Sequence, residues 1–136
     1  MNGILEELRD LEHQLEGNEY CPGGVSYFFA ADKVEILSDM KTSLKEYFLE
    51  IEAVKEDEEI ELQRIEDPKK DMRAICEEWH LSAELTERLI KLVSESRSVY
   101  KFCEDYYYIA AGNVGDIFRV LETDDGVFVL EFYVVD

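Results

Sequence analysis

The chain has 136 residues, of which 33 are acidic and 14 are basic, so its formal net charge at pH 7 is −19. This length, together with 46% hydrophobic residues, is typical of one globular domain that buries a core without disulfides or metals, and it argues against a disordered chain. A negative surface of this size repels nucleic-acid phosphates and anionic lipid, so binding to nucleic acid or to a membrane surface is disfavoured.

The acidic excess has two interpretations. A strongly negative surface attracts a basic protein and speeds its encounter. The alternative is that the charge only keeps the protein soluble. Both interpretations stay open on the sequence.

Three cysteines, Cys21, Cys76 and Cys103, are an odd number without a CxxC spacing. They are typical of reduced thiols in a cytosolic protein. The N-terminal residues lack the basic and then apolar pattern of a secretory signal, and no apolar run approaches the length of a membrane span. We therefore expect a cytoplasmic protein.

The first part of the chain predicts a helix over residues 2–17, followed by strands. Apolar side chains in this helix recur at helical spacing: Ile4, Leu8, Leu11 and Leu15. A strand is expected over residues 25–30, after which residues 32–33 can reverse the chain into a short strand over residues 34–37.

The middle of the chain leaves alternatives open. Residues 38–48 fit either a helix or a loop that leads into a strand. Apolar and polar residues then alternate over residues 49–54 and 60–65, which predicts a hairpin with one buried face. A single long helix is the alternative, because Glu and Lys favour helices. In either case the connection over residues 55–59 is an acidic tip that contains Glu56, Asp57, Glu58 and Glu59.

Two helices are predicted next. Asp67 can cap the first, Pro68 suits its first position, and the helix should end near Trp79. Ser82 can cap the second, whose inner face extends to Val93. The pair resembles a helix-turn-helix in outline, but the second helix lacks the basic excess of a groove-reading helix. We expect a helical hairpin packed on a sheet.

Residues 106–136 predict a three-stranded antiparallel meander with an Asp-Gly hairpin at residues 123–126. Its expected strands are residues 106–111, 116–122 and 127–135. The period of two places Phe128, Leu130, Phe132 and Val134 on one face of the last strand, and Glu131 and Tyr133 on the other. The fold class that follows is a single α+β domain over residues 1–136, with a mostly antiparallel sheet and helices packed on it.

No motif for catalysis or metal binding stands out. Cys76 and His80 are four residues apart and can share a helix face, but no second pair of ligands accompanies them. Cys76 is more simply a small core residue beside Trp79. The turn over residues 112–116 lacks the lysine and the following helix of a phosphate-binding loop. We predict no enzyme activity, no cofactor and no metal.

The C-terminal meander resembles the central segment of the SUKH superfamily. The similarity lies in residues 109–116, an apolar strand end that runs into a Gly/Asn turn and Asp116, and in the Asp-Gly hairpin with its following valine, residues 124–127. Many members of that family are bacterial immunity proteins that bind and neutralise toxins, often nucleases. The resemblance implies an α+β fold and a protein partner.

We therefore expect a protein-binding module, most concretely an immunity or inhibitor protein that masks a basic partner such as a toxin nuclease. The acidic tip would steer the partner. Exposed tyrosines would anchor the partner, the candidates being Tyr106, Tyr108 and Tyr133. The alternatives are an enzyme or small-ligand binder without a recognisable motif, and a homo-oligomeric structural protein that pairs through a strand edge.

Overall fold

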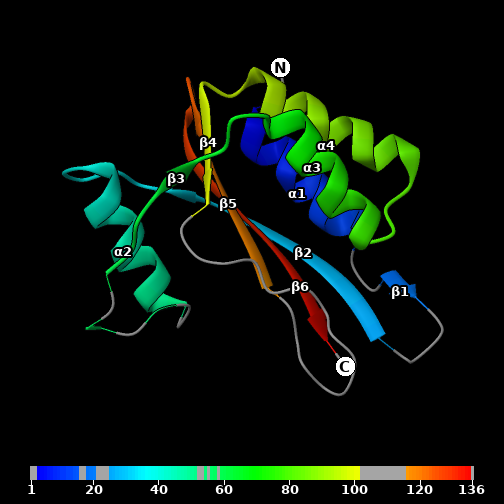
Figure 1. Ribbon diagram of the computed structural model, residues 1–136, viewed down its shortest axis with the longest axis horizontal. Helices are drawn as coiled ribbons and strands as arrows, with labels where there is room; N and C mark the ends of the chain where they lie inside the picture. Colours follow the sequence, from blue (N-terminus) through cyan, green and yellow to red (C-terminus); the bar gives the residue numbers. More distant parts are fainter. Residues whose placement is uncertain are drawn as a thin grey trace.

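The structure is a computed structural model, and it describes residues 3–15, 18–20, 25–51, 54, 56–57, 59–101 and 116–135. These residues contain four helices and six strands (Figure 1). The helices are α1 Ile4–Leu15, α2 Met40–Glu50, α3 Pro68–Glu78 and α4 Ala83–Glu95. The strands are β1 Asn18–Tyr20, β2 Val25–Val34, β3 Gln63–Arg64, β4 Ser98–Lys101, β5 Asp116–Thr123 and β6 Gly126–Val135.

The described strands form one antiparallel sheet in the order β1-β2-β6-β5-β4-β3. The predicted α+β class with a mostly antiparallel sheet is therefore confirmed. The C-terminal meander is also confirmed, because β4, β5 and β6 are neighbours in chain order. Its predicted first strand, residues 106–111, lies outside the described residues, and β4 is the described strand that pairs with β5.

The turn between β5 and β6 is the predicted Asp-Gly hairpin. Asp124 and Asp125 form the turn, and Gly126 begins β6 with a φ of +127°. A side chain at Gly126 would be strained by this φ, and its Cβ would also lie 2.8 Å from the Lys33 Cε atom. Glycine is therefore required at this position.

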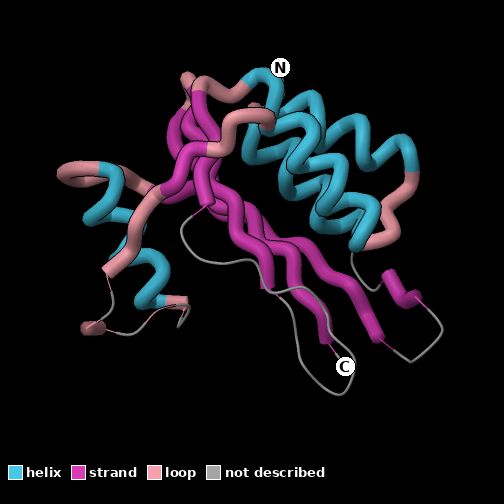
Figure 2. The backbone as a smooth tube through the Cα atoms, in the orientation of Figure 1, coloured by secondary structure: helices cyan, strands magenta, loops and turns pink. Residues whose placement is uncertain are grey.

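Helices cover both faces of the sheet. Figure 1 and Figure 2 show α1, α3 and α4 gathered on one side, with α2 apart from them on the other. Phe128, Leu130 and Phe132 of β6 belong to the core under the three helices. Val127 and Val129 belong to a second, smaller core under α2.

The structure confirms the predicted buried face of β6 and adds a second buried face at the start of the strand. The expected alternation holds for Phe128, Leu130 and Phe132, which share one face. The side chain of Val134 lies outside the described part of the structure. The opposite face is also buried at the start of the strand, where Val127 is 6% and Val129 is 1% exposed. Strand β6 is therefore central in the sheet and buried on both faces beside the β5–β6 turn.

The predicted reversal at residues 32–33 is wrong. Strand β2 continues to Val34, and its last residues pair with the start of β6, Val34 opposite Val127. Asp32 is tolerated inside the strand because its carboxylate accepts hydrogen bonds from Arg9 and Tyr47. Residues 35–37 form no strand.

The predicted hairpin of residues 49–54 and 60–65 is wrong, and so is the alternative of one long helix. Residues 49–50 are the last residues of α2, and the chain turns at Ile51. Within residues 60–65 only β3 is a strand, and it pairs with β4. Helical packing explains why this segment is not a strand. Leu44 and Phe48 are four residues apart, so they share the inner face of α2, and both are fully buried. This result also decides residues 38–48 in favour of a helix.

The predicted helix pair is confirmed as α3 and α4. The Asp67 side chain accepts from the Lys70 N–H, and Pro68 occupies the first turn of α3. Ser82 caps α4 by accepting from the Leu85 N–H. Both helices pack on the sheet, as expected for a helical hairpin.

Side chains of α1 hydrogen-bond to the β2 edge at Ala31, beyond the residues that β1 pairs. The Ala31 carbonyl accepts from Arg9, and the Ala31 N–H donates to the Glu12 carboxylate. Arg9 Nη2 also lies 3.0 Å from Asp32 Oδ1, and the Tyr47 hydroxyl of α2 donates to Asp32 Oδ2 at 2.8 Å. The network satisfies the backbone of Ala31 at this edge and connects α1 to α2 across β2.

Removing the Tyr47 hydroxyl tests this connection. Burial, and then the hydrogen bond to Asp32, raise the pKa of Tyr47, so the hydroxyl stays protonated and donates at neutral pH. The variant Tyr47→Phe is expected to lower the free energy of unfolding by about 1 kcal/mol. Urea unfolding followed by the fluorescence of Trp79, which is 2% exposed, measures this. Tyr100→Phe is the control, because the Tyr100 hydroxyl has no hydrogen bond to the described residues; an equal loss there would contradict the prediction.

Candidate functional site

Acidic residues concentrate around α2. We call residues 35–61 the α2 layer; in the sequence they contain ten acidic and three basic residues. Eight of the ten acids are described, and all eight are exposed: Glu35, Asp39, Glu46, Glu50, Glu56, Asp57, Glu59 and Glu61. The layer therefore presents a dense negative surface on the side of the sheet opposite the three helices.

The acidic tip follows α2 within this layer. Glu56 and Asp57 form a turn, and Glu59 follows, all three with exposed side chains. Glu58 lies outside the described residues. No ion pair to the described residues neutralises Glu56, Asp57 or Glu59. Their charges are therefore available to a partner.

Exposed apolar side chains lie in the same layer. Among the described residues, the large hydrophobic side chains that count as exposed are Ile36 at 37%, Leu37 at 74% and Ile51 at 38%. Ile36 and Leu37 precede α2, and Ile51 follows it. The sequence pattern did not single out these three positions, because it assigned two of them to a short strand and the third to a hairpin with one buried face.

Of the three predicted tyrosine anchors, the structure describes Tyr133. Tyr106 and Tyr108 lie outside the described residues. Tyr133 is half-buried near the end of β6, and its carbonyl accepts from the Trp79 indole at 3.2 Å. At about 3.4 Å per residue, Tyr133 lies roughly 20 Å along β6 from Val127, where α2 packs. Tyr133 is therefore separated along β6 from the residues that pack against α2.

A buried ion pair joins α3 to β5. Arg119 is 1% exposed, and its Nε and Nη2 atoms contact Asp71 Oδ2 and Oδ1 at 2.7 and 2.9 Å. Its Nη1 atom also donates to the Phe118 carbonyl at 2.8 Å. The only sequence signal was an arginine inside an apolar strand. These contacts satisfy the guanidinium within the protein, so the pair positions α3 on the sheet.

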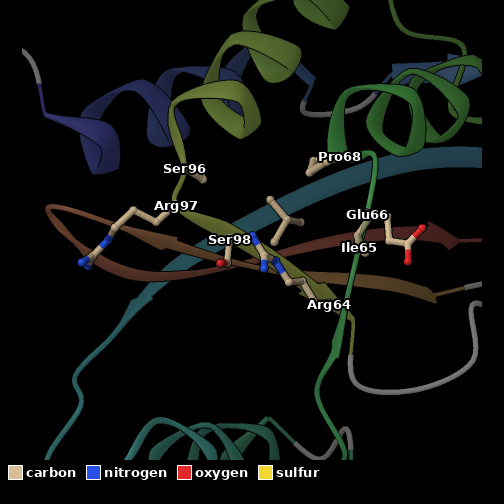
Figure 3. A pocket seen from close by; sticks show the side chains of 8 residues that line it. Arg64, Ile65, Glu66, Pro68, Ser96, Arg97 and Ser98 are labelled. Carbon is tan, nitrogen blue, oxygen red and sulfur yellow. The ribbon is translucent and has the colours of Figure 1, made fainter.

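A depression of about 430 Å³ lies between the β3–α3 and α4–β4 connections. Figure 3 shows Arg64 reaching toward Ser98, whereas Arg97 extends away from them. Arg97 is held by the Thr123 carbonyl at 3.0 Å and by Asp124 at 3.4 Å. Arg64 has no ion pair with the described residues, but the Glu66 carboxylate lines the same depression. Figure 3 shows the Glu66 carboxylate pointing away from the Arg64 guanidinium, and the contacts of the described lining residues include no nucleophile paired with a base.

Cys76 is buried and chemically protected. Its side chain is 1% exposed, and burial raises the pKa of the thiol to about 11. The described residues contain no group of three or more His, Cys, Asp or Glu side chains that could hold a metal ion. His80, four residues further on, is exposed and adopts a φ of +56° just after α3.

Alkylation of Cys76 in the folded protein is expected to be at least about a hundredfold slower than that of a model thiol at neutral pH. The raised pKa reduces the reactive thiolate about tenfold per unit, and burial blocks the reagent further. Iodoacetamide labelling followed by mass spectrometry of the Cys76 peptide measures the rate, with protein in urea as the control. Rapid labelling of the folded protein would contradict the prediction and favour a reactive-cysteine enzyme.

No family model matches the chain, and the searches of curated proteins and of solved structures found no match either. Among the residues of the SUKH resemblance, the structure describes Asp116 and residues 124–127, which belong to the β5–β6 hairpin. None of the described helices has the length and apolar character needed to cross a membrane.

Proposed function

We propose that the protein is a binding module that engages a basic protein through the α2 layer. The most concrete form is a cytoplasmic immunity or inhibitor protein that masks a toxin, such as a nuclease. The observation that carries the proposal is the concentration of ten acidic residues in residues 35–61, eight of them described and exposed.

Charge complementarity supports this choice of partner. Opposite charges across an interface raise the association rate and select against partners of the same sign. A nuclease presents cations because it must bind phosphate groups. An acidic layer on a small protein can occupy such a cationic surface and exclude the nucleic acid. The SUKH resemblance in residues 109–116 and 124–127 points to the same class of partner.

Capture from a lysate of the source organism tests the proposal. The protein is immobilised, and bound proteins are identified by mass spectrometry at low salt and at several-fold higher salt. We expect one basic protein at near-stoichiometric amount, with less retained as the salt concentration rises. The captured protein is then assayed for inhibition by the chain. An empty or indiscriminate capture would contradict the proposal and leave the charge as a solubility device.

A further inference from the structure

The connection between β2 and α2 displays a leucine. Residues 35–39 leave the end of β2 and project beyond the sheet before α2 begins (Figure 1). Within them the Leu37 side chain is 74% exposed, the largest exposure of a large hydrophobic residue in the described part of the chain. A single exposed apolar residue is ordinary on a protein surface. Leu37 differs from such a residue because hydrogen bonds hold the backbone around it.

Hydrogen bonds hold the backbone on both sides of the Leu37 side chain. The Leu37 N–H donates to Ser43 Oγ at 3.1 Å, and Ser43 is itself 5% exposed. Asp39 caps α2, its carboxylate accepting from the Thr42 N–H at 2.8 Å and from the Thr42 hydroxyl at 2.9 Å. These two hydrogen bonds lower the pKa of Asp39, so it stays ionised. The leucine is thus presented on a fixed backbone, which reduces the ordering cost of binding.

The negative charge around Leu37 indicates which kind of partner can bind over its side chain. Glu35 and Asp39 flank Leu37, and both are exposed. A second copy of the chain would bring a surface of the same sign to this corner, and an anionic membrane would be repelled for the same reason. A protein segment with apolar side chains between lysines or arginines complements this site, because its cations can face Glu35 and Asp39 while an apolar side chain contacts Leu37.

We infer that Leu37 is the apolar anchor of the docking surface and inserts among the apolar side chains of a basic partner segment. This inference rests on the proposed function, because the acids of the α2 layer bring the partner to the surface. Burial of Leu37 then adds an apolar contact that salt does not screen. The acids control association, and the leucine controls dissociation.

The test uses two synthetic peptides of equal length and equal positive charge as probes. One has leucines and phenylalanines between its lysines, and the other has serines at those positions. Titration calorimetry measures the binding of each peptide to the full chain and to Leu37→Ser. Ala74→Ser is the control, since it changes an exposed apolar residue of α3, outside the α2 layer. Leu37→Met keeps the apolar volume.

We expect Leu37→Ser to weaken binding of the apolar peptide by about tenfold or more, and to leave the serine peptide unchanged. Leu37→Met should restore most of the affinity, and Ala74→Ser should change it by less than about twofold. An unchanged affinity in Leu37→Ser, or an equal loss in Ala74→Ser, overturns the inference while charge-driven binding stands. If neither peptide binds, the proposed function fails as well. A dimer of the chain that Leu37→Ser abolishes would identify a second copy as the occupant and overturn the inference.

Discussion

Neutralising the acidic tip is expected to slow association with a basic partner by about ten- to a hundredfold at low salt. The variant replaces all four tip acids, as Glu56→Gln, Asp57→Asn, Glu58→Gln and Glu59→Gln. The described members, Glu56, Asp57 and Glu59, are exposed and unpaired within the described part of the chain, so their field reaches into solvent. The effect should shrink as salt is added, because the screening length is about 10 Å at 0.1 M ionic strength.

The dissociation rate should change much less than the association rate. Exposed charges at the rim of an interface act during the approach, whereas buried contacts determine the lifetime of the complex. Stopped-flow or biosensor measurements over a range of salt concentrations separate the two rates. The partner is the basic protein captured from the lysate.

A control variant carries the same change in net charge at a distance from the α2 layer. It replaces four exposed acids of α3 and α4 with glutamine: Glu77, Glu78, Glu84 and Glu95. If the total charge of the protein were decisive, both variants would slow association equally. That outcome would contradict steering by the acidic tip, and so would an association rate that the tip variant leaves unchanged.

The largest loss of stability is expected from Asp71→Ala, which should lower the free energy of unfolding by about 3–5 kcal/mol. The substitution removes the Asp71 carboxylate from the Arg119 cation, whose side chain is 1% exposed. The converse variant, Arg119→Met, should cost only about 1–2 kcal/mol. The Asp71 side chain is 23% exposed, so its carboxylate can be hydrated once the cation is gone.

Urea unfolding of the two single variants and of the double variant measures this asymmetry. The double variant Asp71→Ala with Arg119→Met should be more stable than Asp71→Ala alone, because it no longer buries a cation that has lost the Asp71 carboxylate. A greater loss in Arg119→Met than in Asp71→Ala would show that packing of the arginine, rather than its charge, dominates. Binding to the basic partner should be unchanged in the folded variants, since the pair lies on the other side of the sheet from α2.

Local signals predicted several elements well. A few neighbouring residues determine each of three features: the apolar stripe of α1, the cap and proline of α3, and the serine cap of α4. Their prediction therefore needs no tertiary information. The Asp-Gly hairpin at residues 123–126 is equally local, because Gly126 must adopt a positive φ.

The wrong predictions concern segments whose local pattern was compatible with two different secondary structures. Residues 49–54 alternate apolar and polar, yet residues 49–50 complete a helix whose inner face, Leu44 and Phe48, fills the smaller core. Residues 34–37 look like a strand after a turn, yet β2 runs straight through because β6 pairs with it as far as Val34. In both places the secondary structure was decided by the segment that packs against it or pairs with it in the fold.

The sequence by itself determined the α+β class, the helices α1, α3 and α4, the C-terminal hairpin and the negative charge, because composition, caps and turn residues act locally. Only the tertiary structure decided that the start of β6 is buried on both faces, that Arg119 contacts Asp71, and that Leu37 is exposed beside the acids of the α2 layer. Those facts depend on which distant segments pack together, and the net burial of side chains across the sheet selects that packing.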